Sequence, residues 1–298
     1  MDVKSLLQKN RDEIREDETR KQQALTQFRE WLDKHPFIIK CRKDDAYLLH
    51  FLRTKKYSMD DVFKIFEAHH LFRAHRPEWF ETTSPQRIET IRTIAKTGAS
   101  YMLRKRADDG SLIFVVNFER FTPDKFSVVD GFNFVYNTVA AYMADEDNQL
   151  LGCTFIMNYY NCPLKNLMSF SVRDSAEFAA SANKCAGRYK KYILVGLPAA
   201  ANAMLNAAKT VMTEKQRNRL LLIKDHEELA QHIDKSCLTE ILGGTENESE
   251  VIEEFLKIVE DKYDKITETN DIEVDMKKAA ACRDLEESIG SFRTLEID

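Results

Sequence analysis

The stretch "LIFVVNF", residues 112–118, decides the fold class because it is an uncharged run of strand length. Shorter runs of the same kind follow it: "CTFIM" at 153–157, "YILV" at 192–195 and "LLLI" at 220–223. Strands that are apolar on both faces are typical of a parallel sheet covered on both sides. Helical periodicity fills the intervals, at roughly 127–144, 171–187 and 197–212. The alternation predicts an α/β domain with a largely parallel sheet.

The chain before the first of these runs is predicted to be helical. Residues 3–34 are charge-dense, and their apolar residues gather on one face late in the run, which predicts one long amphipathic helix ended by Pro36. Three more helices are expected, with N-terminal caps at Asp44, Ser58 and Ser84. The pattern predicts three parts: a helical domain at 1–95, the α/β domain at 96–247, and a C-terminal helix with a polar tail at 248–298.

Composition and charge narrow the function classes. The 298 residues are 43% hydrophobic and 31% charged, which suits a folded protein with a well-solvated surface. A net charge of −5 gives no reason to bind nucleic acid, so an anionic partner must meet a local basic patch. The start "MDVKSLLQKNRDEIRED" carries charges where a signal peptide needs an apolar run, and no stretch reaches the roughly 20 apolar residues of a spanning helix. We expect a cytoplasmic monomer whose six cysteines stay reduced.

The usual sequence signatures of an enzyme do not occur in this chain. Its nine glycines form no G-x-G-x-x-G or Walker loop, so nucleotide phosphates have no obvious cradle. There is no G-x-S-x-G elbow, and the seven histidines include no H-E-x-x-H pair. We therefore expect no catalysis, no cofactor and no metal site.

Apolar side chains exceed what an ordinary core needs in one region. The helix predicted at 127–144 carries aromatic and apolar residues over most of its circumference. A filled core explains each residue singly, whereas the set fits a large apolar cavity covered by the segment 197–212. That segment is rich in alanine, which removes little apolar surface from water. It therefore suits a cover that must move away to open the cavity. The predicted lining residues are Phe132, Tyr136, Val139, Tyr142, Met157, Tyr159, Phe170, Phe178, Ile193, Val195, Ala201, Met204, Leu205, Ala208 and Val211.

With these residues in view, the chain resembles the CRAL-TRIO family of lipid-binding proteins. The segment "DDAYLLHFLRTKKYSMDDVFKIFEAHHLFRAHRPE" at 44–78 is similar to the family's N-terminal helical module, including an R-x-x-x-P signature that ends at Pro77. Residues 101–244 resemble the lipid-binding domain, with "TEK" at 213–215 and the closing Gly243-Gly244.

The resemblance implies a movable lid and an anionic-lipid site. In the family, the helix that matches 197–212 is a lid over a cavity for one ligand, and Gly196 and Pro198 stand at its hinge here. The family also holds an inositol-phosphate headgroup with basic residues, and the matching positions are Lys55, Arg188, Lys190, Lys215 and Arg219. This sequence differs from the family pattern at positions such as Asn158 and Ala201, which are expected at the cavity, so the identity of the ligand does not carry over from the family.

Two functions of different classes follow. The first is a non-enzymatic carrier that moves one hydrophobic molecule between membranes and docks on phosphatidylinositol phosphates. Its cargo is tocopherol-like, retinoid-like or a related lipid, and the sequence does not separate these. The second is an interaction module that senses phosphoinositides without transfer and uses the acidic segment after 248 to contact a partner.

Overall fold

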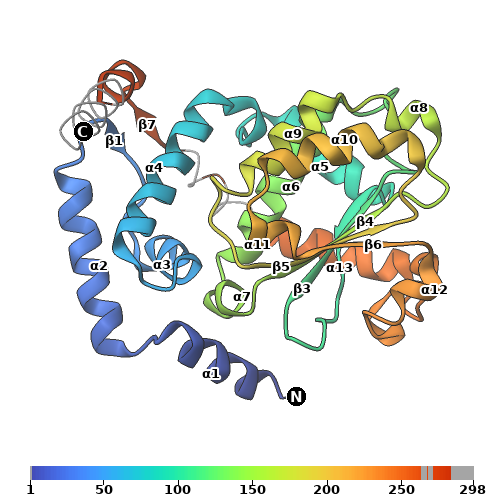
Figure 1. Ribbon diagram of the computed structural model, residues 1–298, viewed down its shortest axis with the longest axis horizontal. Helices are drawn as coiled ribbons and strands as arrows, with labels where there is room; N and C mark the ends of the chain where they lie inside the picture. The colour runs from blue at the N-terminus through green and yellow to red at the C-terminus, as the bar shows by residue number, and fades with distance from the viewer. Residues whose placement is uncertain (1, 263–266, 268–270, 283–298) are drawn as a thin grey trace, which may run out of the picture.

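The computed structural model describes residues 2–262, 267 and 271–282. The N-terminal helices occupy one side of the molecule, and an α/β part occupies the other (Figure 1). The helical part contains α1 (Val3–Ile14), α2 (Glu18–Asp33), α3 (Asp45–Thr54) and α4 (Met59–His75). The 3-10 turn η1 (Pro77–Trp79) and α5 (Pro85–Lys96) follow, and α5 lies within the α/β part (Figure 1). A short strand β1 (Ile38–Lys40) pairs antiparallel with β7 (Glu273–Val274). The polar tail predicted at the C-terminus lies mostly outside the described residues.

The single helix expected over residues 3–34 is wrong, because the chain breaks between α1 and α2. Arg15 adopts a left-handed conformation with φ of 54° and closes α1. The Asp17 side chain then caps α2 by accepting a hydrogen bond from the backbone N–H of Arg20 at 2.8 Å. The break falls within charged residues and contains no glycine or proline, so the sequence carries no strong signal for it.

A five-stranded sheet forms the centre of the α/β part. Its strands are β2 (Ser100–Met102), β3 (Leu112–Asn117), β4 (Cys153–Asn158), β5 (Tyr189–Val195) and β6 (Leu220–Ile223), and they lie side by side in chain order. The strands from β3 to β6 are parallel, whereas β2 joins the edge in antiparallel orientation. The predicted α/β class with a mostly parallel sheet is therefore confirmed, and β2 is the strand that the uncharged runs did not reveal.

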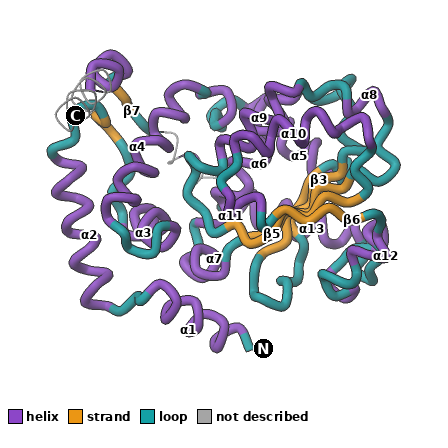
Figure 2. Tube along the Cα trace, in the orientation of Figure 1, coloured by secondary structure: helices purple, strands orange, loops and turns teal. Residues whose placement is uncertain are grey.

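Helices connect the parallel strands and cover the sheet. They are α6 (Val128–Met143), α7 (Glu146–Leu151), α8 (Leu164–Leu167), α9 (Val172–Ser181), the turn η2 (Ala199–Ala201), α10 (Asn202–Val211) and α11 (Glu214–Arg217). After the sheet come α12 (His226–Leu229), the turns η3 (Lys235–Cys237) and η4 (Glu240–Leu242), and α13 (Glu248–Asp261). Figures 1 and 2 show α9 and α10 above one face of the sheet and α12 below it.

The helical part and the α/β part share one apolar cluster. Phe28, Phe51 and Phe66 form its centre, and the Phe28 and Phe66 rings lie 5.0 Å apart. Leu150 and Leu151 of α7 belong to the same cluster and are completely buried. The N-terminal helices therefore rest directly on the α/β part through α7.

Candidate ligand cavity and anion site

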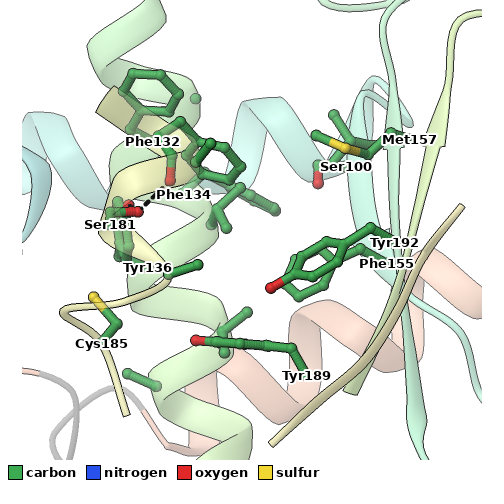
Figure 3. A pocket seen from close by; sticks show the side chains of 18 of the residues that line it. Ser100, Phe132, Phe134, Tyr136, Phe155, Met157, Ser181, Cys185, Tyr189 and Tyr192 are labelled. Carbon is green, nitrogen blue, oxygen red and sulfur yellow. Dashed lines mark hydrogen bonds between the residues drawn. The ribbon is translucent and has the colours of Figure 1, made fainter. Parts of the chain in front are cut away.

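An apolar cavity of about 470 Å³ lies between the sheet and the helices above it. Its floor consists of alternate strand residues, among them Phe155 and Met157 of β4 and Tyr192 and Leu194 of β5. Figure 3 shows Phe132, Phe134 and Tyr136 of α6 on the opposite side of the cavity from these strands. A cavity of this size is in the range that holds one small organic ligand.

The helix α10 covers the cavity with small and flexible side chains. Ala201, Met204, Leu205 and Ala208 line the cavity from this side, and no residue of α10 is fully buried. Because α10 packs chiefly on α9, movement of α10 away from the cavity would expose little of the packed core of the sheet. The arrangement is that of a cover rather than a core helix.

Most of the sequence-predicted lining residues lie at the cavity wall. They are Phe132, Tyr136, Val139, Met157, Tyr159, Phe170, Phe178, Ala201, Met204, Leu205 and Ala208. They come from α6, from β4 and the segment after it, from α9 and from the η2–α10 segment. Segments far apart in the sequence therefore meet around one cavity.

Four predicted lining residues lie elsewhere. Ile193 and Val195 are completely buried on the opposite face of β5, because side chains alternate along a strand. Tyr142 stacks on Phe255 of α13, with ring centroids 6.2 Å apart. Val211 is 37% exposed at the end of α10, and its neighbour Met212 lines the cavity instead.

The cavity also reaches residues that the sequence patterns did not single out. Tyr192 and Leu194 belong to β5, and the correct strand parity would have found them. His50, His69 and Arg73 come from α3 and α4 of the N-terminal part. Arg73 begins the R-x-x-x-P signature, but no sequence pattern placed these three residues at a cavity, because their position depends on how the two parts of the chain pack together.

Several polar groups at the cavity wall are neutral or already bonded, whereas His50 Nε2 and His69 Nδ1 are buried there without a hydrogen-bond partner among the described residues. The Tyr136 hydroxyl donates to Ser181 Oγ, which donates to the Phe178 carbonyl at 2.5 Å. Burial raises the pKa of the Tyr136 hydroxyl and raises the pKa of the Cys185 thiol to about 12, so both stay protonated near neutral pH. The Arg73 guanidinium lies over the Phe80 ring at 4.5 Å. The wall therefore favours an apolar ligand with few hydrogen-bonding groups.

The chain enters the cover through a constrained glycine. Gly196 has φ of 63°, and a Cβ there would lie 3.0 Å from the Tyr160 Cα. The Tyr160 ring packs on His226 with centroids 4.8 Å apart, and the His226 Nε2 atom lies 3.2 Å from Asn158 Oδ1. Only glycine takes this backbone conformation without strain, so the position suits a turn of fixed geometry.

The five basic residues implied by the resemblance gather at one place. Lys55 follows α3, Arg188 and Lys190 lie at the start of β5, Lys215 lies in α11, and Arg219 precedes β6. Partial burial lowers the pKa of Lys215, and the nearby Arg219, Lys56 and Lys55 cations lower it further. Partial burial followed by the Arg188 cation lowers the pKa of Lys190. These mutual effects show that the five residues form one basic cluster with Lys56, which the resemblance did not provide. We call this cluster the candidate anion site, or anion site for short.

Neither a metal centre nor a membrane span is found in the part of the chain that the structure describes. Within it, no group of three or more histidine, cysteine or acidic side chains is arranged to hold a metal ion. No helix of the same residues is long and apolar enough to cross a bilayer.

Comparison with known protein families matches residues 96–244 to the CRAL/TRIO domain. This chain belongs to the CRAL/TRIO family of lipid-binding proteins. The CRAL/TRIO chain is 22% identical over 255 residues to the human "Alpha-tocopherol transfer protein-like", covering 83% of this chain and 72% of that one. It is also 22% identical over 249 residues to Clavesin-1 of Xenopus laevis, covering 80% and 72%. The solved structure of Sfh5 has the same fold, with a TM-score of 0.53 at 11% identity over 79% of this chain and 92% of that one.

Proposed function

We propose that this CRAL/TRIO protein is a non-enzymatic carrier that takes one hydrophobic molecule from a membrane and delivers it to another. The observation that carries the proposal is the apolar cavity of about 470 Å³ under the alanine-rich α10. A small apolar ligand in it exchanges water for apolar contacts, which stabilises the complex by about 25 cal/mol for each Å² buried. A tocopherol-like or retinoid-like molecule, or a lipid of similar size, is the cargo class that fits.

Exposed apolar side chains beside the cover supply a surface for contact with lipid. Leu164 of α8 is 60% exposed, Met168 just after it is 69% exposed, and Val172 of α9 is 45% exposed. Figure 1 shows α8 close to the ends of α9 and α10. Large exposed apolar residues that cluster on a soluble surface commonly mark an interaction site. We assign this cluster to the membrane interface, where α10 opens.

The anion site supplies the second contact with the membrane. Its basic residues offer a phosphatidylinositol phosphate headgroup several charge-assisted hydrogen bonds at one point of a chain whose net charge is −5. Each lysine or arginine near an anionic surface contributes on the order of 1 kcal/mol. Docking through this site would hold the molecule at the membrane while the ligand is exchanged.

A second function is supported by the anion site alone. A phosphoinositide-sensing module would bind the headgroup and recruit a partner through the acidic helix α13 without moving any cargo. Mass spectrometry of an organic extract of the protein purified from its natural source separates the two functions. A lipid present at one copy per chain supports the carrier, whereas protein that binds phosphoinositide vesicles but yields no lipid favours the sensing module.

A further inference from the structure

The helix α1 places a carboxylate inside the anion site. Glu13 accepts a hydrogen bond from Lys56 Nζ at 2.8 Å through one oxygen and from Arg188 Nη2 at 3.0 Å through the other. One turn earlier, the Asn10 side-chain oxygen lies 3.4 Å from Lys190 Nζ. The α1 side chains therefore meet three basic residues of the site where a bound headgroup would also have to lie.

Glu13 satisfies only part of this site. The Arg188 side chain is 9% exposed, and its buried Nη1 atom has no hydrogen-bond partner among the described residues. A buried guanidinium N–H without an acceptor is costly, whereas a phosphate offers three oxygens to the same fork. The site thus has donor capacity that one carboxylate does not use.

The negative charge of Glu13 and the backbone of Lys56 are both in unfavourable surroundings that the contact between the two residues offsets. Glu13 lies in the last turn of α1, where the helix dipole disfavours a negative charge. Lys56 and Tyr57 are both held in the left-handed region, with φ of 51° and 63°. The left-handed conformation is strained for residues other than glycine, so two in succession indicate that Lys56 is held in a constrained position.

Other contacts hold α1 in place independently of Glu13. Ile14 is 1% exposed in the shared apolar cluster. Glu16 pairs with the buried Arg53 through two contacts of 2.8 Å and accepts the Tyr57 hydroxyl at 2.8 Å. Glu13 itself is 47% exposed, and the cations of Lys56 and Arg188 hold its pKa at about 2, so it is ionised at any physiological pH. Its removal should leave the helix docked.

We propose that Glu13 is an intramolecular competitor that occupies the anion site and is displaced when a phosphorylated headgroup binds. The inference rests on the proposed phosphoinositide contact and adds its regulation. Because the incoming group must outcompete a resident carboxylate, the site selects headgroups that carry more than one phosphate over lipids with a single negative charge. The N-terminal helix therefore sets a threshold for membrane docking.

The test compares Glu13→Gln with Asp12→Asn, an equal change of charge at the adjacent exposed residue of α1. Binding is measured by sedimentation with phosphatidylcholine vesicles that contain phosphatidylinositol bisphosphate, and by calorimetry with soluble inositol trisphosphate. We expect Glu13→Gln to bind both probes about fivefold more tightly than the wild type, the value expected from one charge near an anionic group. Asp12→Asn should stay close to the wild type.

The outcomes separate this inference from the proposed function. The proposal that Glu13 competes with the headgroup is overturned if Glu13→Gln and Asp12→Asn bind the two probes with equal affinity. It is also overturned if Glu13→Gln binds them more weakly than the wild type. A gain on phosphatidylserine vesicles that Asp12→Asn shares also overturns it, because the effect would then be one of general surface charge. If the wild type and both variants bind phosphoinositide vesicles no better than phosphatidylcholine vesicles, the headgroup contact itself is wrong.

Discussion

Buried histidines between α3 and α4 make the stability of the protein depend on pH. His70 is completely buried, its Nδ1–H donates to the Phe66 carbonyl at 2.9 Å, and burial lowers its pKa to about 3. Burial also lowers the pKa of His50 to about 4 and the pKa of His69 further below its usual value. The unfolded chain takes up these protons near the ordinary pKa of about 6.5, whereas the folded chain does not. Stability is therefore lost as pH falls below that value.

Replacement of His70 tests this linkage. His70→Asn keeps a donor near the Phe66 carbonyl but cannot titrate, so it should be less stable than the wild type at about pH 7 because ring packing is lost. Its further loss of unfolding free energy between about pH 7 and pH 5 should be smaller than that of the wild type by roughly 2 kcal/mol. Urea unfolding at the two pH values measures the difference. The exposed His75→Asn is the control, and an unchanged pH slope in His70→Asn would contradict the prediction.

Strand parity limits what can be read from single residues. The run "YILV" is apolar throughout, so nothing in it says whether Ile193 or Leu194 faces the cavity. A sheet buried on both faces erases the alternation that would separate the two sets. On α6 and α10, by contrast, the spacing of the apolar residues shows which face of the helix is buried. This is why most of the predicted helical residues lie at the cavity and the two predicted residues of β5 do not.

At the scale of elements, α10 combines an apolar inner side with an exposed end. Met204 lines the cavity, while Val211 on the same helix is 37% exposed. The two positions therefore offer matched substitutions in the same element. A carboxylate at the first faces the cavity and must be desolvated or protonated, whereas one at the second stays in water.

Met204→Glu should weaken retention of a hydrophobic probe by on the order of tenfold, the effect of leaving one buried polar group without a partner. Val211→Glu should retain the probe as the wild type does. Displacement of a fluorescent fatty ligand and its transfer between liposomes measure both variants. Retention by Met204→Glu equal to that by Val211→Glu would show that α10 does not cover the ligand.

Element boundaries and long-range contacts differ in how far the sequence predicts them. The parallel strands follow from uncharged runs, and the caps at Asp44 and Ser84 follow from local chemistry. The break at Arg15 does not, because a left-handed arginine has no signature in its neighbours. The meeting of Glu13 with Arg188 was also not predictable, because a separation of this length in the chain is closed only by tertiary packing.

At the scale of the whole molecule, a buried charge network joins the helical part to the α/β part. The Arg53 side chain is 2% exposed. It contacts Glu16, which lies between α1 and α2, and Glu146 and Gln149 of α7 at distances of 2.8 to 2.9 Å. Removal of one member of a buried pair leaves the other charge without compensation and costs about 3–5 kcal/mol. We therefore expect the two parts to unfold together.

Arg53→Ala should lower the free energy of unfolding by about 3–5 kcal/mol. Arg92→Ala is the matched control, because Arg92 of α5 is 40% exposed and its contact with Glu260 of α13 at 2.9 Å is worth at most about 1 kcal/mol. Thermal and urea unfolding measure both variants. Similar losses in the two variants would mean that the Arg53 network does not join the two parts.

The distribution of charge over the whole chain gives the sharpest test of membrane docking. A protein of net charge −5 is repelled by anionic membranes, so its binding depends on a concentrated positive site. Lys215→Ala combined with Arg219→Ala should weaken binding to phosphatidylinositol bisphosphate vesicles by roughly thirtyfold, from about 1 kcal/mol per charge. Binding of a hydrophobic ligand in detergent should not change, because neither residue lines the cavity.

The control for this double variant removes two exposed lysines that are not part of the anion site, Lys64 of α4 and Lys257 of α13. It changes the net charge by the same amount and leaves the anion site intact. Binding of the wild type should also weaken as salt rises toward about 0.5 M, because screening shortens the reach of the basic residues. If both double variants lose binding equally, net charge governs the association. In that case the cluster around Lys215 is a solvated surface rather than a headgroup site.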